Sequence, residues 1–217
     1  LLAGTGGAVV FLFMPSQKKP AMPAKPDFAA AVTVFRNKPF RLAAFGYFGH
    51  MWELYALWSV LPLLLTAYQQ SRHVTADPYW WSFLGIGVGC LGCAFGGFLS
   101  LHWGSEKVAF WALLFSFACC LLAPILFKSA PTVFYPFILI WGITVVADSP
   151  QFSALVAKAA GQKVKGTALT AVTCIGFAIT IVSIQLLKDV FSGQKEAALW
   201  LLAPGPLLGL IALKWKK

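Results

Sequence analysis

The sequence predicts an all-α protein that is embedded in a membrane. Hydrophobic residues make up 59% of the 217 residues and charged residues only 11%, against roughly 45–50% and about 25% in soluble domains. The mean hydropathy is +0.76. A chain of this length has too little interior to keep so much apolar surface from water, so lipid must cover part of it. The same composition excludes a disordered chain, a coiled coil and a small disulfide scaffold.

Six apolar stretches follow a basic opening segment, and each is predicted to cross the bilayer as a helix. They cover residues 42–68, 80–102, 108–128, 132–147, 166–187 and 197–213. A transmembrane helix needs about 20 residues, with a range of roughly 17–25. The fourth and sixth stretches are short, and Pro204 and Pro206 should kink the sixth.

Two segments precede these spans. Residues 1–14 are apolar but lack a basic start, so a signal peptide is a poor interpretation and the end of a preceding membrane helix is a better one. Residues 15–41 contain five prolines and six basic residues, which predicts a solvated linker with a short helix near residues 28–36. The remaining residues, 42–217, are predicted to form one six-helix transmembrane domain.

The basic residues predict how the chain is oriented. The 17 Lys and Arg residues outnumber the 7 Asp and Glu residues, which gives a net charge of +10. Such a balance is also typical of nucleic-acid binding, but the excess lies in short segments between apolar stretches. With six spans, 13 of the 17 basic residues fall on the side of the linker. The positive-inside rule therefore places the linker and the C-terminus in the cytoplasm, and no nucleic-acid partner is expected.

One acidic residue, Glu53, lies well inside a predicted span, and His50 precedes it by three positions. At 100° per residue the two side chains share a helix face with Gly46, Leu57 and Leu61, so this face should meet a cavity or a partner helix. A charge inside a span costs about 2.5–3.5 kcal/mol on insertion scales and is a functional hypothesis by default. We interpret Glu53 and His50 as a pair that couples transport to a proton or a substrate. A hydrogen-bonded pair that only fixes this helix to its neighbour is the alternative.

The second predicted span is rich in small residues. Gly85, Gly89, Cys93 and either Gly96 or Gly97 fall on one side, which predicts close packing against another helix. Cys90 and Cys93 allow a second interpretation, a thiol redox pair of a membrane enzyme. All five cysteines lie in apolar stretches without the spacing of a disulfide framework, so they are predicted to be small packing residues. No metal-ligand spacing stands out, and neither a metal nor a cofactor is expected.

The loop after the second span carries the most diagnostic pattern. Residues 96–107 read Gly-Gly-Phe-Leu-Ser-Leu-His-Trp-Gly-Ser-Glu-Lys. This segment resembles the loop signature of the major facilitator superfamily, roughly G-x-L-a-D-R-x-G-R-R, which follows the second helix of each six-helix half. Gly97, Leu99 and Gly104 match the signature. The departures lie at its charged positions, which hold Leu101, His102, Ser105 and Glu106.

The resemblance implies that the chain is the C-terminal half of a transporter of this superfamily. Residues 1–14 resemble the end of the sixth helix, residues 15–41 the central cytoplasmic linker, and the six spans helices seven to twelve. The implied fold is two inverted three-helix repeats. The implied function is secondary transport of a small solute by alternating access, with proton coupling, in the inner membrane of a bacterium and together with an N-terminal six-helix half. On this interpretation the protein is not an enzyme. The alternatives are the thiol redox enzyme and a half-size transporter that dimerises with itself.

The resemblance also directs attention to further candidate residues. Tyr47 and Leu57 of the first span, and Thr170, Thr173 and Phe177 of the fifth, are predicted to line the substrate cavity. Gly97 and Gly104 belong to the cytoplasmic loop signature, and Asp148 is interpreted as part of an inner gate. Asp148 or Ser149 should also cap a short amphipathic helix, residues 150–160, that lies along the inner face of the membrane.

Overall fold

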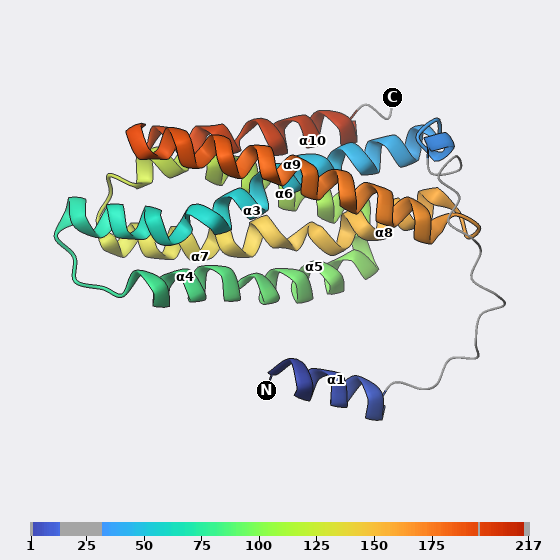
Figure 1. Ribbon diagram of the computed structural model, residues 1–217, viewed down its shortest axis with the longest axis horizontal. Coiled ribbons are helices and arrows are strands. Elements are labelled where there is room, and N and C mark those ends of the chain that lie inside the picture. The colour runs from blue at the N-terminus through green and yellow to red at the C-terminus, as the bar shows by residue number, and fades with distance from the viewer. Residues whose placement is uncertain (1, 14–31, 195, 215–217) are drawn as a thin grey trace.

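The computed structural model describes residues 2–13, 32–194 and 196–214, and within these ranges the chain forms helices and turns but no β-strand. The helices are α1 (Leu2–Phe13), α3 (Lys38–Arg72), α4 (Pro78–Gly87), α5 (Gly89–Trp103), α6 (Ser105–Leu126), α7 (Pro131–Ala147), α8 (Ser149–Ala160), α9 (Lys165–Gln194), the 3₁₀ helix η1 (Ala197–Leu202) and α10 (Pro204–Lys214). From α3 to α10 they run lengthwise in one bundle (Figure 1). The predicted all-α class is confirmed.

Five helical segments are long and apolar enough to cross a membrane. They are Pro78–Trp103, Ser105–Leu126, Pro131–Ala160, Lys165–Ser192 and Ala197–Lys214. These segments indicate a multi-pass integral membrane protein and coincide with the second to sixth predicted spans. The first predicted span lies in α3, which has 35 residues but is not among the five. Polar side chains such as His50 and Glu53 interrupt its apolar sequence, so a sixth crossing stays a prediction.

The N-terminal segments are only partly described. Residues 2–13, within the predicted end of a preceding helix, form α1, and its described side chains are exposed. Most of the predicted linker lies outside the described residues. Of the short helix predicted near residues 28–36, residues 32–34 are helical and a turn follows.

The structure corrects the prediction for residues 150–160. Helices α7 and α8 form one segment of 30 residues, Pro131–Ala160, and α8 packs against α3, α6 and α9 inside the bundle. Phe152 and Val156 are 0% and 1% exposed. Asp148 between the two helices keeps right-handed helical backbone angles, φ −85° and ψ −18°. The helical segment therefore continues past the break, and α8 does not lie along the membrane face.

Only one of the two glycines of the loop signature lies in a loop, as the resemblance implied for both. Gly104 separates α5 from α6 with φ of 80°, a conformation that favours glycine. Gly97 lies inside α5, and a Cβ atom added there would meet nothing within 4 Å. The prediction that Gly97 is a loop residue was wrong, whereas Gly104 does form the tight turn.

Glycines bring the helix pair α4–α5 against α7, as the small-residue pattern predicted. A Cβ atom at Gly92 or Gly96 would meet the backbone carbonyl of Ile143 or Ala147. Gly142 of α7 meets Gly85 in the same way. This contact fixes α7 beside α4–α5, which helps to position the α7 residues that face α3.

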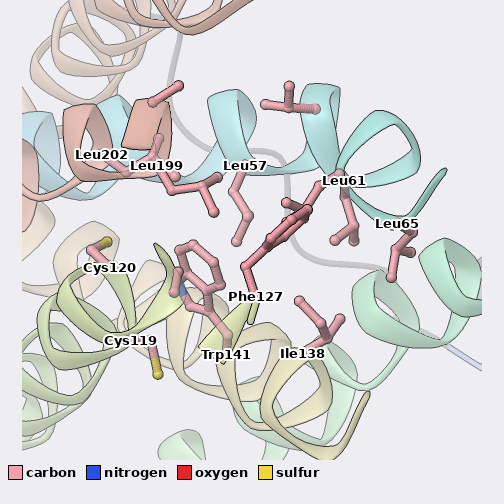
Figure 2. Close-up of a cluster of buried hydrophobic side chains, with 14 of the residues drawn as sticks. Leu57, Leu61, Leu65, Cys119, Cys120, Phe127, Ile138, Trp141, Leu199 and Leu202 are labelled. Atoms are coloured by element: carbon pink, nitrogen blue, oxygen red, sulfur yellow. The ribbon is translucent and has the colours of Figure 1, made fainter. Parts of the chain in front are cut away.

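Two hydrophobic clusters form the core, and they meet along α3. The larger begins at Leu54 and includes Tyr68, whose ring stacks on Phe134 with centroids 3.9 Å apart; Figure 2 shows its centre around Trp141. The smaller contains the part of α3 up to Met51. His50 and Glu53 therefore lie at the junction between the two clusters.

Candidate functional site

The predicted polar stripe of α3 faces the interior of the bundle. His50 and Glu53 are each 1% exposed, and Leu57 and Leu61 on the same face are each 3% exposed. Gly46 on this face lies against the ring of Phe152 in α8. Of the two settings expected for this stripe, a cavity or partner helices, the structure provides partner helices.

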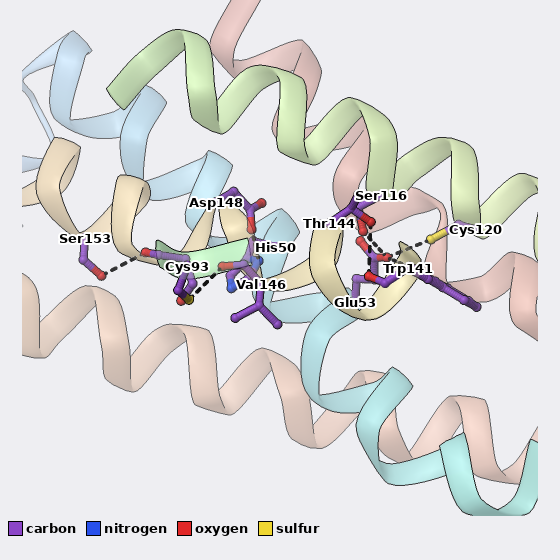
Figure 3. Close-up of polar contacts among 11 residues, drawn as sticks. His50, Glu53, Cys93, Ser116, Cys120, Trp141, Thr144, Val146, Asp148 and Ser153 are labelled. Atoms are coloured by element: carbon purple, nitrogen blue, oxygen red, sulfur yellow. Dashed lines mark hydrogen bonds and ion pairs between the residues drawn. The ribbon is translucent and has the colours of Figure 1, made fainter. Parts of the chain in front are cut away.

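The carboxylate of Glu53 joins three helices through one oxygen. Its Oε1 accepts hydrogen bonds from Ser116 Oγ at 2.6 Å, from Trp141 Nε1 at 2.8 Å and from Cys120 Sγ at 3.2 Å (Figure 3). Ser116 and Cys120 are four residues apart on α6, so they present their side chains on the same face. Trp141 comes from α7. A carboxyl group that enters a bundle interior needs such donors to offset its loss of water.

His50 makes the second polar link from α3. Its Nδ1 lies 2.9 Å from Oδ1 of Asp148, and both side chains are 1% exposed. Asp148 is seven residues, or about two helical turns, after Trp141. The predicted capping role of Asp148 was wrong, because its side chain makes no cap hydrogen bond and faces His50. Asp148 thus lies inside the bundle, at the junction of α7 and α8.

Several atoms of this pair lack hydrogen bonds. Among the described residues, His50 Nε2 and Asp148 Oδ2 have no hydrogen-bond partner. Buried polar atoms in this state are uncommon in stable proteins and call for an explanation such as a bound proton, water or ion. His50 Nε2 and Asp148 Oδ2 can therefore take a new partner without first breaking a hydrogen bond at these atoms.

We call the following residues the buried polar site: His50, Glu53, Ser116, Cys120, Trp141 and Asp148. Three of them are ionisable groups of the types that carry protons in proteins, two carboxyls and an imidazole. A buried charge is stable only when it is paired or neutralised by a proton. The site is therefore suited to bind a proton and to change the links between α3 and its neighbours when the proton leaves.

The structure brings together only some of the residues predicted to line a substrate cavity. Leu57 is 3% exposed within the larger core cluster, so a solute does not reach it in this conformation. Tyr47 is 8% exposed, and its hydroxyl faces Thr173 of α9. Thr170 is exposed, and Phe177 is 46% exposed, with its ring centroid 5.4 Å from that of Tyr55 in α3.

The cysteines have separate environments. All five are free; Cys90 is exposed, and Cys93 is half-buried with its Sγ 3.6 Å from the carbonyl oxygen of Val146. Within the described ranges, no three His, Cys, Asp or Glu side chains gather in a way that would hold a metal ion.

Sequence reasoning found His50, Glu53 and Asp148 but did not single out Ser116, Cys120 or Trp141. The spacing of Ser116 and Cys120 places them on one face of α6, which is a signal only once a partner on α3 is known. No family model, curated protein or solved structure matches this chain. The functional interpretation therefore depends on the geometry of the buried polar site and on the arrangement of the helices.

Proposed function

We propose that the protein is a secondary transporter of the major facilitator type, in which the bundle from α3 to α10 is the C-terminal six-helix half. It moves a small solute by alternating access and couples this movement to a proton carried by Glu53. The observation that carries the proposal is the Glu53 carboxyl, 1% exposed, one helical turn from the His50–Asp148 pair in a bundle of membrane helices. Ionisable groups in such a position mark proton and substrate pathways in membrane proteins.

The distribution of charge supports a cytoplasmic position for the end of the bundle that holds Lys38. The connections between consecutive helical segments alternate between the two ends (Figure 1). Among the described residues, that end carries Arg36, Lys38, Arg41, Lys107, Lys158, Lys163, Lys165 and Lys214, and the opposite end carries Arg72, Lys128 and Lys188. An excess of Lys and Arg on one side is typical of the cytoplasmic side. The proposal includes α3 as the sixth crossing.

The coupling mechanism follows from the two polar links of α3. Glu53 joins α3 to α6 and α7, and His50 joins α3 to the α7–α8 junction. A proton on the Glu53 carboxyl group removes a charge from the interior and weakens the attraction of that group to the neighbouring donors. The free energies of the two conformations then change by different amounts, which is how a bound proton shifts a conformational equilibrium. His50, one helical turn from Glu53, modulates the proton affinity of the Glu53 carboxyl group.

A flux assay in proteoliposomes tests the proposal. The complete transporter, with both six-helix halves, is offered a panel of small solutes under an imposed pH gradient, and the solute that the wild type accumulates is then measured with Glu53→Gln. We expect the variant to lose proton-driven flux but to retain solute exchange across the membrane. Glu196→Gln is the matched control, because Glu196 is 35% exposed and pairs with Lys128 at 3.5 Å. Unchanged proton-driven flux in Glu53→Gln would refute proton coupling. Loss of activity in Cys93→Ala with a disulfide that cycles would instead favour the thiol redox enzyme.

A further inference from the structure

A groove opens on the side of the bundle between α9 and α10, with α3 as its floor. It encloses about 720 Å³ and is lined by α3 between Lys38 and Trp52, by Ile179 of α9 and by α10 between Pro204 and Ala212. Figure 1 shows α9 and α10 diverging toward the end of the bundle where α3 begins. A volume of this size is typical of sites that hold a small organic ligand.

The two ends of this groove differ in chemistry. Lys38 and Arg41, both exposed, lie at one end of the groove, and the other described lining residues are apolar or glycine, with no acidic residue among them. Its walls include large side chains that remain open to the surroundings: Phe45 is 50% exposed and Leu208 is 63% exposed. The groove therefore combines an anion-binding entrance with an apolar body.

The length of the groove matches one leaflet of a bilayer. Arg41 and Trp52 are 11 residues apart on α3, a rise of about 16 Å along the helix. The hydrocarbon core of a bilayer is about 30 Å thick, so one leaflet contributes about 15 Å. Near its inner end α3 and α10 approach closely, because Gly49 and Gly205 lie against each other's backbone. The groove thus begins at a basic entrance and narrows at the depth where an acyl chain ends.

We propose that this groove binds a phospholipid with an anionic headgroup. The phosphate contacts Lys38 and Arg41, whose guanidinium group matches phosphate oxygens with paired hydrogen bonds. One acyl chain lies along α3 between Phe45 and Leu208. The headgroup charge supplies the selectivity, since basic residues near a membrane surface attract anionic lipids. This inference requires only that the bundle lies in a membrane, and it does not depend on transport.

Photo-crosslinking in vesicles tests the proposal. The protein is reconstituted with phosphatidylglycerol or phosphatidylcholine that carries the same photoreactive acyl chain, and the labelled peptides are identified by mass spectrometry. We expect phosphatidylglycerol to label residues 42–52 and 204–212 several-fold more than phosphatidylcholine does. Neutralising Lys38 and Arg41 to Gln should reduce the phosphatidylglycerol labelling by about five-fold for each charge removed. The control K163Q/K165Q removes two exposed charges outside the groove and should leave the labelling unchanged.

A second variant distinguishes the contribution of the groove's shape from that of its two basic residues. Leu208→Trp narrows the groove at an exposed position and keeps both basic residues, so labelling by both lipids should fall there. Equal labelling by the two lipids, or phosphatidylglycerol labelling that survives K38Q/R41Q, would overturn the proposal. Crosslinks from this groove to a second copy of the chain or to another membrane helix would overturn it as well, because a protein would then occupy the site.

Discussion

Replacing Gly142 of α7 by Ala tests the helix contact that places α7 beside its neighbours. A Cβ atom at this position would meet the backbone carbonyl of Gly85, and the Cγ2 atom of Val88 at 3.1 Å. A carbonyl group of a helix backbone cannot turn aside as a flexible side chain can, so α4 and α7 must separate. Overpacking of this kind costs about 1–3 kcal/mol, while Ala in a helix gains about 0.5–1 kcal/mol over Gly. We expect a net loss of unfolding free energy of about 0–2.5 kcal/mol, centred on about 1 kcal/mol.

Gly97→Ala is the matched control for this prediction. Gly97 also lies inside a helix, α5, but a Cβ atom added there would meet nothing within 4 Å. It should therefore show only the propensity gain, about 0.5–1 kcal/mol. The assay is unfolding in mixed micelles of a mild detergent and increasing dodecyl sulfate, followed by far-ultraviolet circular dichroism. Equal stability of the two variants would refute the close contact of α4 and α7.

Three further predictions concern the buried polar site. Trp141→Phe removes the indole donor to Glu53 and should lower the unfolding free energy by about 0.5–1.5 kcal/mol, whereas Trp111→Phe, at a position 47% exposed, should change it by less than about 0.5 kcal/mol; a smaller loss for Trp141 than for Trp111 would contradict the hydrogen bond. His50→Gln and Asp148→Asn should be non-additive by about 0.5–3 kcal/mol in a double-mutant cycle, and additive losses would mean that the two groups do not interact. Cys120 is 0% exposed, so a small maleimide should modify it only after unfolding, and modification of the folded protein would disprove its burial.

The sequence predicted which face of α3 is buried but not what that face contacts. Helical spacing alone places His50 and Glu53 on one stripe, and the structure buries both. The donors to Glu53 come from residues 63 to 88 positions later in the chain. Which helices become neighbours depends on packing details such as the contact between Gly142 and Gly85, and a hydrophobic pattern does not encode that choice.

Asp148 illustrates a different limit. The Asp-Ser-Pro sequence correctly predicted that a helix begins there, and a proline does lie in its first turn. The side chain of such a residue can either cap the helix that follows it or bind a group that is distant in the sequence. His50, 98 positions earlier, offers the carboxylate a buried partner instead. The residues around Asp148 also keep helical angles, so α8 continues the direction of α7 where composition suggested a surface helix.

In the proposed function, Glu53 of the buried polar site takes up and releases a proton while the protein lies in lipid. Infrared difference spectroscopy of the reconstituted protein, between mildly alkaline and mildly acidic buffer, measures this directly through the absorption of a protonated carboxyl group. We predict a band that disappears in Glu53→Gln and persists in Glu196→Gln. An identical band in wild type and Glu53→Gln would contradict the claim, because the titrating carboxyl group would then lie elsewhere.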